Sequence, residues 1–85
     1  MRKSSLKAAN LAQANLSQAE LFEADLSQAD LEAADLSGAD LAIANLNQAN
    51  LNQAALERAN LRGANIKDAI LDGTILEGGD SSLAT

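Results

Sequence analysis

A leucine or isoleucine occupies every fifth position of this 85-residue chain, from Leu6 to Leu76, without one interruption. From Ala9 to Thr74 a small residue, almost always alanine, stands two positions before each of them. The residue between the two is usually asparagine or aspartate. The repeating unit is therefore Ala-(Asp/Asn)-Leu-x-x, in which the x positions are mostly polar or small. So regular a repeat constrains the fold before any local propensity is considered.

A period of five fits neither a regular α-helix nor a flat β-strand. In an α-helix each residue advances by about 100°, so leucines five residues apart wind around the cylinder and form no apolar stripe. In a flat strand an odd period moves successive leucines to opposite faces. Within one unit, however, the alanine and the leucine lie two residues apart and share a face. The spacing predicts a short extended piece and then a corner, repeated along the chain, despite the helix propensity of Ala, Leu, Gln and Glu.

A corner of about 90° per unit closes a square after four units, and stacked coils then pair at the strand spacing of about 4.8 Å. The units that show this pattern, such as Ala24-Asp25-Leu26-Ser27-Gln28, resemble those of pentapeptide-repeat proteins over residues 4–78. The resemblance implies an all-β fold, a right-handed quadrilateral β-helix of about four coils with leucine and alanine turned inward. We expect an N-terminal extension at 1–3, the solenoid at 4–78 and a flexible C-terminal tail at 79–85.

The composition argues against several classes of function. The chain has no cysteine and no histidine, and its formal net charge is −6. The commonest metal ligands and general base are therefore absent, and the acidic balance disfavours binding to nucleic acid or an anionic membrane. We expect no enzyme, no catalytic, cofactor-binding or metal-binding residues and no cofactor. Because the sequence shows no secretory signal and no membrane span, we expect a cytoplasmic protein.

An acidic belt is the most prominent charge feature. No basic residue interrupts the carboxylates between Lys7 and Arg58. Its members are Glu20, Asp25, Asp30, Asp35 and Asp40, together with Glu23 and Glu32. Residues twenty apart should stack, which places Asp25 between Ser5 and Asn45 and spreads the aspartates over different sides. Two interpretations stay open, a solvated polar face or a surface for a basic partner, and we favour the solvated face.

Two apolar groups break the polar exterior. Phe22, the one aromatic residue, and Ile43 follow the central leucines and should face outward, with Ala42 beside them. Two large apolar side chains together indicate a candidate protein-interaction patch. Near the end of the repeats, Ile70 and Ile75 replace the polar residue that precedes the leucine. With Leu83 they form a candidate end-to-end interface, covered either by the tail or by the same end of a second molecule in a weak homodimer.

These features favour a non-enzymatic structural or protein-interaction module whose partner the sequence does not identify. The alternative follows from the resemblance alone. Some pentapeptide-repeat proteins mimic duplex DNA in shape and charge, bind DNA gyrase and protect it from quinolones. The acidic composition agrees with that alternative, whereas the short repeat region does not.

Overall fold

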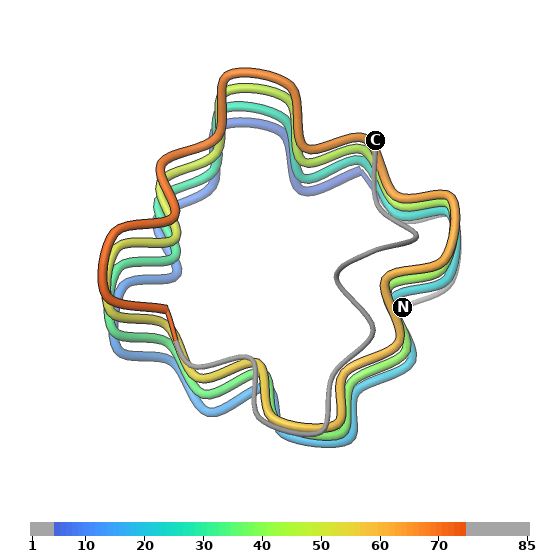
Figure 1. Cartoon of the computed structure of the whole chain (residues 1–85). Coiled ribbons are helices and arrows are strands. Elements are labelled where there is room, and N and C mark those ends of the chain that lie inside the picture. The colour runs from blue at the N-terminus through green and yellow to red at the C-terminus, as the bar shows by residue number, and fades with distance from the viewer. Residues whose placement is uncertain (1–4, 75–85) are drawn as a thin grey trace.

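The backbone is a four-sided coil in which successive turns lie directly above one another (Figure 1). The computed structural model describes residues 5–74. Parallel β-bridges join each residue before a central leucine to the residue twenty positions later, from Ser5–Asp25 to Asn50–Ile70. At 20 residues per coil, these 70 residues form three and a half coils. Within 5–74 there is no helix, and each unit contributes one bridging residue instead of a longer strand.

Every corner is a β-turn with the same backbone signature. The amide of each small residue donates to the carbonyl of the preceding central residue, as from Ala39 to Leu36 at 3.0 Å. The second residue after each leucine has a φ between 59° and 70°, the left-handed value that type II turns require at their third position. Because the turn returns the chain inward after each unit, a period of five places every leucine on the same face.

The preference for aspartate or asparagine before the leucine has a local cause. In ten of the described units the Oδ1 atom accepts the backbone amide two residues further on, an Asx turn that holds the corner. These residues are Asn10, Asn15, Asp25, Asp30, Asp35, Asp40, Asn45, Asn50, Asn60 and Asn65. A short side-chain oxygen reaches this amide, so both residue types serve the fold equally well.

The unit 44–48 shows that this arrangement satisfies every backbone donor. The amide of Ala44 closes a turn, those of Asn45, Leu46 and Gln48 pair with adjacent coils, and that of Asn47 donates to the Asx oxygen. The acceptors are the carbonyls of Leu41, Ala24, Asn65 and Lys67 and the Oδ1 atom of Asn45. An unpaired buried amide would cost free energy comparable to a lost hydrogen bond, so this complete pairing stabilises a helix without long strands.

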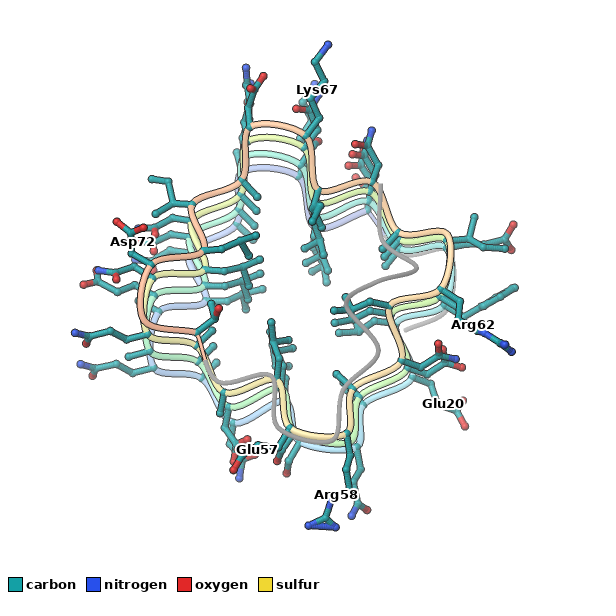
Figure 2. All side chains as sticks on the ribbon, in the orientation of Figure 1. Glu20, Glu57, Arg58, Arg62, Lys67 and Asp72 are labelled. Atoms are coloured by element: carbon teal, nitrogen blue, oxygen red, sulfur yellow. The ribbon has the colours of Figure 1, made fainter. Side chains whose placement is uncertain are left out.

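The core is a stack of leucine and alanine inside the square (Figure 2). The central leucines that are fully buried are Leu21, Leu26, Leu31, Leu36, Leu41, Leu46, Leu51 and Leu56. Leu6, Leu11 and Leu16 of the first coil, and Ile66 and Leu71 near the other end, are only half-buried. Figure 2 labels Arg58, Arg62 and Lys67 on successive sides. They follow one another counter-clockwise as the chain approaches the viewer, so the helix is right-handed.

The predicted quadrilateral β-helix and its twenty-residue stacking are confirmed within the described residues. Asp25 bridges Ser5 on one side and Asn45 on the other, as the spacing predicts. The proposed boundaries at 1–3, 78 and 79–85 lie outside the described residues and stay predictions. Leu76, the last of the regularly spaced leucines, lies outside them too.

Truncating a central leucine should destabilise the fold far more than truncating an outward side chain. For Leu36→Ala we expect the free energy of unfolding to fall by about 2–5 kcal/mol, because a fully buried side chain leaves a cavity. Gln13→Ala is the matched control, since Gln13 is exposed and Ala33 already occupies the stacked position with the same backbone. Urea unfolding followed by circular dichroism gives both values. Equal losses would contradict the assignment of the core.

Candidate functional site

The structure distributes the four aspartates of the acidic belt over all four sides of one coil. Asp25, Asp30, Asp35 and Asp40 each precede a central leucine of the second coil, residues 25–44, and successive units occupy successive sides. Nine of the ten bridged pairs contain at least one uncharged residue, which limits repulsion between coils. The exception is Glu20–Asp40, two carboxylates stacked on one side. The four aspartates therefore do not converge on one point.

Two of these aspartates are held by serines of their own turns. The hydroxyl of Ser27 donates to Asp25 Oδ1 at 2.7 Å, and Ser37 does the same for Asp35. These hydroxyl bonds, followed by the bonds from the serine amides, lower the pKa of both carboxyls although desolvation opposes the shift. Lys7 lowers the pKa of Asp25 slightly further. Both carboxylates thus take part in the architecture of the turns.

The predicted patch lies on one side of the helix, which we call the Leu41 side: residues 19–23, 39–43 and 59–63. Phe22 is half-buried, Ala42 is buried, and Ile43 is 54% exposed. The sequence placed all three outward. In the stack, however, Phe22 lies directly below Ala42 and Arg62 directly above it, so these longer side chains cover the alanine. Figure 2 shows Glu20 and Arg62 on this side. Ile43 is therefore the main exposed apolar group of the patch.

Ile43 also adopts an unfavourable backbone conformation. Its φ is 61°, and it is the one β-branched residue among the eleven non-glycine residues with positive φ in the described part of the chain. The others are Ala, Gln, Glu, Arg and Asp, which tolerate this conformation better. A β-branched residue there is a genuine outlier, and such strain costs about 1–3 kcal/mol. The sequence alone predicted an outward Ile43 but not this strain.

The residue stacked above Ile43 is Gly63, whose lack of a side chain keeps the isoleucine accessible. A Cβ atom at Gly63 would lie 3.4 Å from Ile43 Cγ1, which is ordinary contact. Any longer side chain there would cover the isoleucine from above. Gly63 itself has a φ of 69°, so glycine also suits the turn.

A polar hollow that the sequence did not predict lies around Gly38. It has a volume of about 350 Å³ and is lined by Gln18, Ser37, Gly38, Glu57 and Arg58. Gly38 stacks between Gln18 and Arg58, and its missing side chain opens the space. Its lining side chains supply a negative charge, a positive charge and an amide around an open depression. Its lining residues are far apart in sequence, and the signal that could have found it is the predicted twenty-residue stacking, which places Gly38 between two long side chains.

The predicted end-to-end interface is only partly described. Ile70 is 48% exposed, in agreement with its expected outward orientation. Ile75 and Leu83 lie outside the described residues. Their proposed contact with a second molecule stays a prediction.

The chain belongs to the pentapeptide-repeat family. The family model of pentapeptide repeats matches residues 1–38 and 39–78 with eight copies, and proteins of this family form right-handed quadrilateral β-helices. A search of curated proteins returned no match. The family assignment thus agrees with the geometry described above.

Several solved structures are similar to this chain. The pentapeptide repeat protein Rfr23 from the cyanobacterium Cyanothece 51142 is 46% identical over 89% of this chain, with a TM-score of 0.88. A second, alr5209 from Nostoc PCC 7120, is 38% identical over 87%, with a TM-score of 0.52. HetL from Nostoc sp. PCC 7120, involved in the regulation of heterocyst differentiation, is 39% identical over 84%, with a TM-score of 0.50. The chain spans 52%, 65% and 35% of these proteins, respectively.

Two features are absent from the described residues. Residues 5–74 contain no helix with the length and apolar character needed to cross a membrane. Nor do three or more potential metal ligands of the His, Cys, Asp and Glu types gather among them. The aspartates before the leucines of the second coil instead lie on separate sides, and among the bridged pairs only Asp40 stacks on another carboxylate, that of Glu20.

Removing the Ser27 hydroxyl should raise the pKa of Asp25 toward its ordinary value. Because this pKa is lower in the folded protein, the ionised carboxylate stabilises the fold above about pH 4, and that contribution disappears as the pH falls further. In Ser27→Ala we expect the pKa to rise and the acid-sensitive part of the stability to shrink. Carboxyl NMR titration measures it, with Asp35 as the internal reference. An unchanged Asp25 pKa would show that the hydroxyl is not the main cause.

Proposed function

We propose that this protein is a non-enzymatic interaction module that binds a protein partner through the Leu41 side. The observation that carries the proposal is Ile43, which is both strained and exposed. Strain in a residue of this type persists only where the surroundings impose it, and it is concentrated at functional sites. The stability of the isolated helix gives no reason for an isoleucine here.

The other units show what the fold prefers at this position. Glutamine occupies it in five described units and glycine in three, and all have positive φ. Two of the glutamines, Gln28 and Gln48, form a side-chain hydrogen bond of 3.0 Å between coils. Ile43 forgoes such a bond and leaves 54% of its surface in water. Contact with a partner would bury this surface and offset the cost.

The separation of the carboxylates supports a role without catalysis. General acid–base chemistry needs two groups directed at one reacting bond. The aspartates of the second coil lie on four sides instead, and Asp25 and Asp35 are bound by their own turns. The reported regulatory involvement of the similar protein HetL is compatible with action through binding.

The alternative, a DNA-mimicking protector of DNA gyrase, stays a prediction that no specific contact favours. The weak end-to-end association through Ile70 is likewise a prediction. The first would use the acidic belt, which covers all four sides, and the second would use one end of the helix.

Affinity capture with and without the Ile43 side chain tests the proposal. The full-length protein and its Ile43→Gln variant are used as baits in lysate of the source organism, and bound proteins are quantified by mass spectrometry. Glutamine is compatible with this backbone, so the variant should fold. We expect at least one specific partner whose recovery falls about tenfold, because a central apolar contact carries a large share of binding energy.

Ile70→Asn is the matched control, since it removes another exposed isoleucine away from the Leu41 side. The expected partner should be retained by this variant. If every specific partner binds equally to the natural protein and to Ile43→Gln, the Leu41 side is not the binding surface. Circular dichroism of all baits verifies that they are folded.

A further inference from the structure

We infer that the partner of the Leu41 side presents a lysine or arginine next to an apolar side chain. This inference rests on the proposed function and specifies the chemistry of the partner. It combines two departures from the repeat pattern that occur on the same side of the helix. One is the strained Ile43, and the other is the stacked carboxylate pair Glu20–Asp40.

The Glu20–Asp40 pair departs from the way charges are stacked elsewhere. Bridged residues of adjacent coils are about 5 Å apart, where two like charges repel each other. In the described part of the helix every other aspartate before a leucine has uncharged residues directly above and below it. At the two turn positions that follow each leucine, no residues twenty apart within 5–74 carry charges of the same sign. Within residues 5–74 like charges are therefore stacked only beside the apolar patch.

The two carboxylates are available to an external cation. Glu20 is exposed, and among the described residues its carboxylate has no hydrogen-bond or ion-pair partner. Asp40 Oδ1 accepts one hydrogen bond from the backbone amide of Ala42 at 3.1 Å and another from the side-chain amide of Asn60 at 3.4 Å. A cation placed between the carboxylates would replace their repulsion by two attractions. A guanidinium or ammonium group supplies the donors for such a contact.

The apolar contact lies within reach of the same partner segment. Along the chain Asp40 is followed by the inward Leu41, then by Ala42 and the protruding Ile43. Directly below, Glu20 is followed by Leu21 and the half-buried Phe22. Between the carboxylates and the isoleucine lies the buried Ala42, with Phe22 stacked below it and Arg62 above it. A basic side chain and an adjacent apolar one would therefore contact both features together.

A divalent cation is the competing occupant of the carboxylate pair. Two carboxylates offer few of the six to eight oxygen ligands that calcium takes, and no third acidic ligand gathers with them among the described residues. A metal ion would also leave the exposure of Ile43 without an explanation. The charge and the apolar group together favour a protein segment.

Peptide titration followed by NMR tests the inference. The probes are a short synthetic peptide with one leucine flanked by two arginines and its counterpart with two glutamates. We expect the arginine peptide to shift the amide resonances of residues 20–23 and 40–43, with weak, millimolar affinity because the contact area is small. Glu20→Gln with Asp40→Asn should weaken this binding by about fivefold or more, since both charge contacts are lost.

Asp30→Asn with Glu32→Gln is the matched control, because it removes the same amount of charge from another side of the helix. It should change the affinity by less than about twofold through the general field alone. Asparagine preserves the Asx turn in both variants, as it does at Asn50 and Asn60. Ile43→Gln should also weaken the binding.

Each of the following outcomes would overturn the inference. Equal weakening by the control variant would show attraction to the whole belt. Equal binding of the glutamate peptide, or no binding of either peptide, would exclude a basic–apolar partner segment. Resonance shifts at Glu20 and Asp40 with calcium or magnesium alone would identify a cation site. None of these results affects the capture experiment with Ile43→Gln, which tests the proposed function separately.

Discussion

The left-handed residue in every turn is the constraint on which this structure depends. It lets an extended segment of three residues be followed by a sharp corner, so that the chain completes a square in twenty residues. The period of twenty residues then fixes the position of every side chain in the repeat. Residues twenty apart stack, leucine and alanine point inward, and the remaining three positions of each unit form outward columns. Any functional surface has to be built from those columns.

Because the backbone donors are satisfied by the repeat and its Asx side chains, the other outward side chains carry little of the folding energy. The unit 44–48 pairs all five of its amides with backbone carbonyls or its own Asx oxygen. The two outward positions after each leucine can therefore vary freely, provided that they tolerate the turn, and all outward positions avoid like-charge stacks within 5–74 apart from Glu20–Asp40. Ile43 violates the first condition and Glu20–Asp40 the second. The proposed contact with another molecule rests on their occurrence on one side, since local violations are expected at functional sites.

The sequence predicted the architecture well because an uninterrupted period is a direct record of which residues face the core. The position of Asp25 between Ser5 and Asn45 follows from counting alone. The backbone conformation at the second turn residue was not predictable in this way. Glutamine is frequent there, and its propensity does not indicate a positive φ.

The details of the candidate site depended on neighbours in adjacent coils. The sequence placed Phe22 and Ala42 outward, but their burial is decided by the side chains stacked above and below them. The hollow at Gly38 has the same origin, because Gln18 and Arg58 are brought together only by stacking. The repeat thus reveals the column of a residue, whereas its exposure depends on the lengths of the side chains in that column.

The central claim is that the Leu41 side sacrifices folding stability for contact with a partner. Urea unfolding of the Glu20→Gln, Ile43→Gln double variant tests it most directly, because both changes remove a local conflict without altering the core. The account predicts a free energy of unfolding about 1–2 kcal/mol higher than that of the natural protein, from relief of backbone strain and of like-charge repulsion. A double variant less stable than the natural protein would contradict the claim, since these residues would then support the fold.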